Sequence, residues 1–493
     1  MFEACHPFAF FDYFRVPYEV QSPLHADDHA GAPAFVHRLR AAVQSGRVPR
    51  SMLWMGTDAR LAASPTSCRL GRYQLGDCTL FAHVALDAAV PVMLKEFGRG
   101  WRPAEPILDA DGRPIAAIWR DCHGSVFLPF DPGEVMQQFW SEKYLKVGRS
   151  PVAAARHVAM LRAYYLVRPA LPRRLQLELR RHFTRVQAMS SFPRWPVEDS
   201  LHNLYTRLFA LVSEVTDRPV PFLDVWPGGR SWALVLTHDV ETYAGYHNLD
   251  LLRGPERELG YRSSWNFVGL RYTVSDDMVR ALQNEGCEVG VHGLRHDGRD
   301  LGSRRLMEKR LPAMREYAQR WNAAGFRSPA TQRSWEFMPR LGFEYDSSYS
   351  DTDPYEPQPG GCCTYLPYFN ERMVELPITL PQDHTLFTIL QHSDADLWVR
   401  KAEHLRERHG MVLVLTHPDY AHDPRLADGY KTLLDAFEGD ETVWHALPRD
   451  VAAWWRQRAA STIRRNGDGW RIEGPASANG RVRFATSSQT GSA

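Results

Sequence analysis

The sequence predicts an α/β fold in which residues 229–460 form a distorted (β/α) barrel, preceded by a smaller α/β or β-rich module and a helical connector. Short apolar runs alternate with helix-length amphipathic stretches through the second half of the chain, as in parallel sheets and barrels. Proline and glycine clusters at 219–221 and 227–229 mark where this pattern begins. Polar residues suited to catalysis or metal binding follow several of the apolar runs, as they do at the rim of a barrel.

The first 130 residues predict a small module of unknown role. Its β-like runs lie at 51–55, 78–84, 115–119 and 125–129, with turn signals at Asp111-Gly112 and His123-Gly124. Apolar residues then recur at helical spacing between about 132 and 216. We therefore expect four consecutive segments: the module at 1–130, a helical connector at 131–228, the barrel at 229–460, and a C-terminal hairpin and tail at 461–493.

The net charge is close to zero, with 59 Lys and Arg against 58 Asp and Glu. No global field attracts the protein to nucleic acid, so we expect no nucleic-acid partner. One local exception is an arginine-rich stretch at 156–185, a candidate docking surface for an anionic glycan or lipid head group, although a solvated helix face is the favoured interpretation. Its arginines are Arg156, Arg162, Arg168, Arg173, Arg174, Arg180, Arg181 and Arg185.

Three further features predict a soluble, cytoplasmic protein. The seven cysteines are odd in number and form no Cys-x-x-Cys pair, which argues against a disulfide framework. The aromatic N-terminus carries Glu3 and Asp12 and lacks the basic start of a signal peptide. No apolar run approaches the length of a transmembrane segment.

Six apolar runs predict the strands of the barrel, at 232–236, 264–268, 288–291, 373–376, 411–415 and 443–446. Between them, Ser275 is a predicted N-cap for a helix over 276–285, and Ser303 opens a second helix that Pro312 is expected to bend. After the barrel, runs at 470–472 and 482–484 predict a β-hairpin followed by a frayed tail.

The first barrel strand ends in Thr237-His238-Asp239-Val240-Glu241. Residues two apart on a strand share a face, so Asp239 and Glu241 can converge on one point. Solvated acids in a turn would give the same pattern. The surrounding motifs decide whether the two acids form a site or a solvated turn.

A second group, His292 and His296, follows the run at 288–291. Two neutral imidazoles and one carboxylate make a common three-ligand set for a divalent metal and leave a position open for water. The His-x-x-x-His spacing is weak by itself, because His25 and His29 repeat it in a polar loop with no strand before it.

Two more candidates follow later runs. Arg327, in Gly325-Phe326-Arg327-Ser328-Pro329, could hold a carboxylate base in its ionised form. His417, which follows the run at 411–415, could act as a general acid for a leaving amine. An ordinary surface Arg and a structural His are the alternatives, and the recurrence at successive strand ends favours the site.

The order of these motifs, with Gly-Phe-Glu-Tyr-Asp-Ser-Ser-Tyr at 342–349 and Leu-Thr-His-Pro at 415–418, resembles the polysaccharide deacetylase superfamily, also called carbohydrate esterase family four. The resemblance covers about 232–450. It implies a distorted barrel with one divalent metal, bound by His292 and His296. It also implies that Asp239 is the base, that Arg327 orients Asp239, and that His417 protonates the departing amine.

The sequence departs from this family's usual pattern in three places. The second acid of the first motif is Glu241 rather than an adjacent aspartate, and strand alternation favours Glu241 as the metal carboxylate, with Asp239 as the alternative. Ala330 stands where an aromatic residue is usual. The acid that pairs with His417 has three candidates, which are also the predicted substrate-binding residues: Asp346, Asp351 and Asp353.

The resemblance implies a metal-dependent hydrolase that removes an N-acetyl or related acyl group from a glycan or glycan precursor, by attack of metal-bound water on a C–N bond other than a peptide bond. Zinc is the first candidate metal, with cobalt and nickel as alternatives. The competing hypotheses are an inactive glycan-binding pseudoenzyme and a hydrolase of a small non-peptide amide on the same fold.

Overall fold

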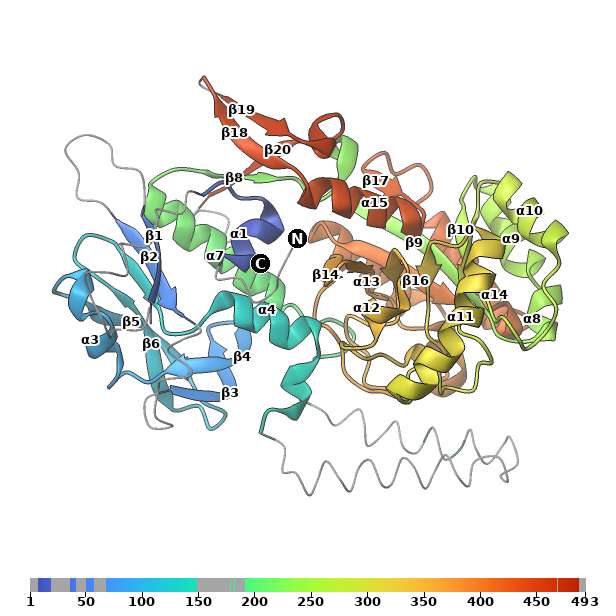
Figure 1. Cartoon of the computed structure of the whole chain (residues 1–493), viewed down its shortest axis with the longest axis horizontal. Coiled ribbons are helices and arrows are strands. Elements are labelled where there is room, and N and C mark those ends of the chain that lie inside the picture. Colours follow the sequence, from blue (N-terminus) through green and yellow to red (C-terminus); the bar gives the residue numbers. More distant parts are fainter. Residues whose placement is uncertain are drawn as a thin grey trace. The chain divides into compact units, whose positions relative to one another are not determined.

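The computed structural model describes residues 8–18, 36–40, 50–56, 68–148, 178, 181, 191–467 and 469–486 (Figure 1). Contacts divide the chain into two compact units, each discontinuous in sequence. One contains residues 225–457 with the described part of 151–198, and the other contains the described part of 2–150 with 199–224 and 458–486. Most of the arginine-rich stretch at 156–185 lies outside the described residues.

The barrel unit contains a nine-stranded sheet in the order β14-β15-β13-β12-β11-β10-β9-β16, with β17 also paired to β9. All neighbours in it are parallel except β14 and β15. Its strands are β9 (Trp232–Val240), β10 (Ser263–Phe267), β11 (Glu288–Val291), β12 (Gly325–Phe326), β13 (Tyr345–Asp346), β14 (Tyr368–Asn370), β15 (Met373–Glu375), β16 (Met411–Thr416) and β17 (Val443–His445).

The sheet curls towards closure because the chain after β15 reaches β16. The backbone amides of Thr379 and Leu380 both donate to the carbonyl of Leu413. Every residue of β9 is buried, which explains its nearly continuous apolar sequence. The predicted distorted (β/α) barrel is therefore confirmed.

Helices surround these strands (Figure 1). Helices α10 and α11 pack on β11, and α13 packs on β16. The helical segments are η4 (Pro227–Gly229), α8 (Tyr243–His247), α9 (Asp250–Glu258), α10 (Asp276–Asn284), α11 (Arg304–Trp321), η5 (Pro329–Thr331), α12 (Met338–Leu341), the π-helix η6 (His384–Ile389), α13 (Asp396–Glu407), η7 (Pro418–Tyr420), α14 (Pro424–Asp435) and α15 (Pro448–Ala459).

The predicted helix starts are confirmed, since the Ser275 and Ser303 hydroxyls accept the amide protons of Met278 and Leu306. Helix α11 continues through Pro312 to Trp321. Among the described residues, no helix is both long and apolar enough to cross a membrane.

The second unit contains a seven-stranded sheet in the order β1-β2-β7-β6-β5-β3-β4. Only β2 and β7 pair in parallel. Its elements are α1 (Ala9–Phe14), β1 (Val36–Arg40), β2 (Ser51–Met55), β3 (Cys68–Leu75), β4 (Cys78–Ala85), α3 (Val90–Met93), η1 (Lys95–Phe97), β5 (Arg102–Leu108), β6 (Pro114–Arg120), β7 (Val126–Leu128), α4 (Pro132–Trp140), η2 (Lys143–Lys146), α7 (Ser200–Thr216), β8 (Val220–Leu223), β18 (Thr462–Asn466), β19 (Gly469–Glu473), η8 (Pro475–Ser477) and β20 (Val482–Ala485).

The predicted C-terminal hairpin is wrong in its pairing. Strand β19 pairs with the preceding β18, and β20 pairs with β8, more than 200 residues earlier. Gly467 has a φ of +58°, a conformation that glycine adopts at little cost and that allows the chain to reverse between β18 and β19. The distant partner of β20 could not be found by comparing neighbouring runs.

Candidate metal centre

The predicted site residues follow the carboxyl ends of four parallel strands. Asp239 is the second-last residue of β9, and Glu241 directly follows that strand. His292 directly follows β11, Arg327 directly follows β12, and His417 directly follows β16. In a barrel these strand ends meet at one rim. The sheet therefore gathers residues that lie up to 178 positions apart in sequence.

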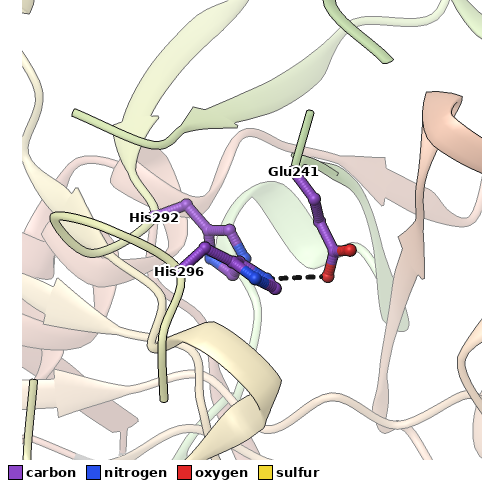
Figure 2. Close-up of side chains that lie close together, drawn as sticks. All are labelled: Glu241, His292 and His296. Atoms are coloured by element: carbon purple, nitrogen blue, oxygen red, sulfur yellow. Dashed lines mark ion pairs between the residues drawn. The ribbon is translucent and has the colours of Figure 1, made fainter. Parts of the chain in front are cut away.

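Three candidate metal ligands converge at this rim (Figure 2). One ligand atom from each of Glu241, His292 and His296 lies within 4.8 Å of the others. Nε2 of His296 is 2.8 Å from Oε1 of Glu241. The structure thus places together the three residues predicted from sequence, and it brings Glu241, rather than Asp239, into this set.

His292 has the chemistry of a metal ligand. Its Nδ1 lies 3.1 Å from the carbonyl oxygen of Arg327, so a proton on Nδ1 leaves the lone pair on Nε2. That Nε2 is buried and has no hydrogen-bond partner among the described residues. Burial lowers the pKa of His292 to about 4, which keeps the ring neutral at pH 7. The donor set of two imidazoles and a carboxylate fits zinc, and cobalt and nickel accept the same donors.

The loop between the two histidines is fixed by close packing. Gly293 has a φ of +65°, and a Cβ atom there would lie 2.3 Å from Oδ2 of Asp300. The same Asp300 oxygen accepts the amide proton of Leu294, and Arg310 pairs with the other oxygen. His296 itself has a φ of +52°, a strained conformation that this packing maintains.

Asp239 is buried beside the metal ligands. Its Oδ1 accepts a hydrogen bond from Nδ2 of Asn266 at 2.9 Å and lies 3.5 Å from a guanidinium nitrogen of Arg327. Its Oδ2 lies 3.6 Å from Nδ1 of His292. Burial alone would raise the pKa of Asp239, but His292, Arg327 and His417 outweigh it and lower the pKa below the usual range.

Arg327 is almost completely buried and is held by several acceptors. It donates to the carbonyl and hydroxyl oxygens of Ser347 at 2.6 and 2.7 Å, and to the hydroxyl of Thr237 at 2.8 Å. With all of these bonds in place, the guanidinium has one position next to Asp239. This is the arrangement expected of a residue that orients a base.

The acid that pairs with His417 is Asp383, so none of the three aspartates predicted for this pairing is its partner. Oδ1 of Asp383 is 2.6 Å from Nδ1 of His417, and its Oδ2 accepts the backbone amide proton of His417 at 2.6 Å. Burial would lower the pKa of His417, but Asp383, Glu241 and Asp239 raise it to about 10. Nε2 of His417 lies 3.8 Å from Oε1 of Glu241, so the other side of the ring faces the candidate metal centre.

The three aspartates proposed from sequence bond to other groups. Asp346 accepts from the hydroxyl of Ser348, and Asp351 forms a buried ion pair with Lys401 at 2.7 Å. Asp353 accepts the amide proton of Tyr355. Their contacts explain why these acids occur in the segment at 346–353 and leave the predicted substrate-binding role untested.

Two supporting residues were not predicted from sequence, Asn266 and Asp383. Asn266 lies in β10, opposite Asp239 of β9 in the parallel register. Asp383 directly precedes η6, well beyond the end of β15, so the strand-end pattern does not indicate it. Ala330, which stands where the resembled family usually has an aromatic residue, is exposed and has a φ of +55°.

No family model matches this chain, and no curated protein matches it by sequence. Solved structures are similar to about half of it. A putative polysaccharide deacetylase from Mycobacterium smegmatis is 18% identical, with 50% of this chain and 98% of that chain covered and a TM-score of 0.40. A probable polysaccharide deacetylase from Pseudomonas aeruginosa PAO1 is 17% identical, with 50% and 97% covered and a TM-score of 0.40. Puue allantoinase is 16% identical, with 47% and 92% covered and a TM-score of 0.38.

Proposed function

We propose that the barrel unit is a metal-dependent hydrolase that removes an N-acetyl or related acyl group from a glycan or glycan precursor. The observation that carries this proposal is the convergence of Glu241, His292 and His296 at a rim that also holds an ionised carboxylate and a protonated imidazole. A base and an acid on either side of a metal site are what hydrolysis of an amide requires.

Glu241, His292 and His296 would hold the metal. A divalent cation bound there supplies Lewis acidity, which lowers the pKa of water and stabilises negative charge on a carbonyl oxygen. Zinc remains the first candidate because its usual ligands include imidazole nitrogen and carboxylate oxygen.

Asp239 would accept the proton of the attacking water. It is ionised because Arg327 and the nearby histidines lower its pKa, and Asn266 and Arg327 fix its Oδ1. Its Oδ2 accepts no hydrogen bond from Asn266, so that oxygen is the one available to a proton. These contacts support the roles of Asp239 as the base and Arg327 as the residue that orients it.

His417 would give a proton to the leaving amine. Asp383 holds its Nδ1 and stabilises the imidazolium, which leaves the Nε2 proton directed towards the site. An amine is a poor leaving group until it is protonated, so this proton transfer is as necessary as the attack itself.

The order of the motifs supports an acylated amino sugar as the substrate class. A small non-peptide amide is the competing substrate, and the two can be separated by assay. The predicted substrate roles of Asp346, Asp351 and Asp353 remain part of the proposal. Each can be tested by substituting the residue and measuring turnover in the same assay.

Metal content and turnover test the proposal together. The full chain and its His292→Ala/His296→Ala variant would be dialysed and analysed for metal, with His404→Ala on α13 as a matched control. We expect about one divalent ion per chain in the parent and control and none in the double variant. Release of acetate from N-acetylated oligosaccharides should follow the metal.

Each result that contradicts the proposal overturns a different part of it. If the parent binds no metal after reconstitution with zinc, cobalt or nickel, the metal-hydrolase proposal is wrong. If it binds metal and hydrolyses only small amides, the glycan part is wrong. If it binds metal and glycan without turnover, the protein is a binding module.

A further inference from the structure

Asp419 joins two loops of the candidate site, although it is not among the proposed metal ligands or proton-transfer residues. It lies two residues after His417, in η7. One carboxylate oxygen accepts the backbone amide proton of Glu241 at 2.9 Å, and the other accepts the hydroxyl proton of Thr242 at 2.5 Å. The loop after β16 is thereby bonded to the loop after β9 at the residue that would bind metal.

The space around this carboxylate is closed on the side of α8. A Cβ atom at Gly245 would lie 2.3 Å from Oδ2 of Asp419 and 2.8 Å from Oδ1. The backbone of Gly245 is not in the left-handed region, so an alanine there would have no conformational strain. The absence of a side chain at this position is therefore explained by the position of Asp419.

A second contact from the same turn reaches Glu241. The hydroxyl of Tyr420 lies 3.4 Å from Oε2 of Glu241, while Oε1 of Glu241 is the oxygen near His296. The backbone of Glu241 is held by Asp419 and one end of its carboxylate is held by Tyr420. Glu241 is only partly buried, and these contacts fix its backbone and one end of its carboxylate.

We propose that Asp419 is a positioning residue that holds Glu241 in place to bind the metal. This inference rests on the proposed function only in taking Glu241 as a ligand. A carboxylate suits the task because both of its oxygens accept, whereas an asparagine side chain has one acceptor and two donors. Asp419→Asn therefore keeps an acceptor for only one of these two donors, and its Nδ2 can contact the Thr242 hydroxyl only by donating, which reverses the present bond.

The experiment measures the affinity of the full chain for Zn²⁺, and the absorption spectrum of its Co²⁺ form, in the parent and in Asp419→Asn. Loss of an outer-shell partner costs about 10- to 100-fold in metal affinity. We expect a rise in Kd in that range and a changed Co²⁺ spectrum. Asp423→Asn is the matched control, because Asp423 caps α14 from the same segment.

Gly245→Ala provides a second perturbation of the same contact. Alanine favours a helix over glycine, so the variant should fold, but its methyl group displaces the Asp419 carboxylate. We expect Zn²⁺ affinity to fall in the same direction as in Asp419→Asn, with the thermal unfolding of the metal-free protein close to that of the parent.

A Glu241→Gln background shows whether Asp419 acts through Glu241. If it does, Asp419→Asn changes the Zn²⁺ Kd by much less in Glu241→Gln than in the parent. A parent-like Kd and Co²⁺ spectrum in folded Asp419→Asn would overturn the inference and leave the proposed function standing. A parent that binds no Zn²⁺ or Co²⁺ would overturn the proposed function and this inference with it.

Discussion

Replacing Asp383 with asparagine should lower the pKa of His417 and therefore the pH above which the proposed hydrolase activity is lost. Asp383 is the largest of the contacts that raise this pKa, and its carboxylate lies 2.6 Å from the ring. Asparagine has the same shape but no charge. It also has a single acceptor oxygen, so it can serve the His417 amide or the ring nitrogen, but not both.

The size of the effect follows from the pKa of His417, which is raised from 6.5 to about 10. One pKa unit corresponds to about 1.4 kcal/mol, so the imidazolium is favoured by on the order of 5 kcal/mol relative to water. An opposite charge at this distance contributes about 1–3 units of such a shift. Asp383→Asn should therefore lower the pKa by about that much.

The pH profile should shift in a defined direction, because His417 is the proposed proton donor. The donor form exists below the pKa, so a lower pKa moves the basic limb of the pH profile of kcat/KM to lower pH. A bound dication would lower the pKa of His417 in both proteins, and the difference between their basic limbs therefore carries the test. Because the parent pKa is about 10, such a fall leaves much of His417 protonated at neutral pH, so the loss of kcat/KM should be small there and should grow as the pH rises.

The assay is acetate release by zinc-loaded protein between pH 5 and 10, with Asp394→Asn as a matched control, because Asp394 accepts the amide proton of Asp396 at the start of α13. Zinc content should be the same in all three proteins, since Asp383 does not contact the three candidate ligands. An unchanged basic limb in Asp383→Asn, with zinc bound, would refute the assignment of His417 as the acid that Asp383 supports.

Two further predictions concern residues behind the site. Arg327→Met should reduce kcat/KM by on the order of 10²-fold, because Asp239 loses its orienting cation. Arg327→Lys should recover only part of the lost activity. Full activity in Arg327→Met would remove Arg327 from the mechanism. Glu256→Gln should lower the free energy of unfolding by about 2–5 kcal/mol at pH 7, measured by urea denaturation, because Glu256 accepts bonds from Ser263, Tyr430 and His238. Its folded pKa is lowered, so this contribution exists above the unfolded value and disappears as the pH falls through the folded one; a difference from the parent that persisted in strong acid would contradict this explanation.

The sequence predicts the site residues best where they lie at or directly after the end of a strand. Asp239, Glu241, His292 and His417 all follow apolar runs long enough to recognise, and the structure brings all four to one rim. The strands β12 and β13 have two residues each, too few for a period-two pattern, and only the motif around Arg327 indicated the first of them.

The partner of His417 was missed for a different reason. The aspartate-rich segment at 346–353 is conspicuous in composition, so the sequence pattern favours its acids as partners of His417. Those aspartates are used in buried contacts, including the pair of Asp351 with Lys401. Asp383 stands alone in sequence, and only the approach of the chain after β15 to β16 places it beside His417. A contact made where the barrel closes depends on the tertiary structure and cannot be predicted from local sequence patterns.

Strand alternation also explains why neighbouring polar residues in β9 have different roles. Asp239 bonds to Asn266 and lies near Arg327 at the candidate site. His238, one residue earlier, points to the opposite face of the strand, where its ring nitrogens lie 2.7 Å from Thr416 and from Glu256 of α9. Thr416 immediately precedes His417, so the bond between His238 and Thr416 fixes the ends of β9 and β16 relative to each other on the outer face of the sheet. Asp419 joins the loops after the same two strands on the rim. The proposed acid and the proposed metal carboxylate are thus held in register by contacts on two faces, so changes at His238 should affect stability whereas changes at Asp419 should affect metal affinity.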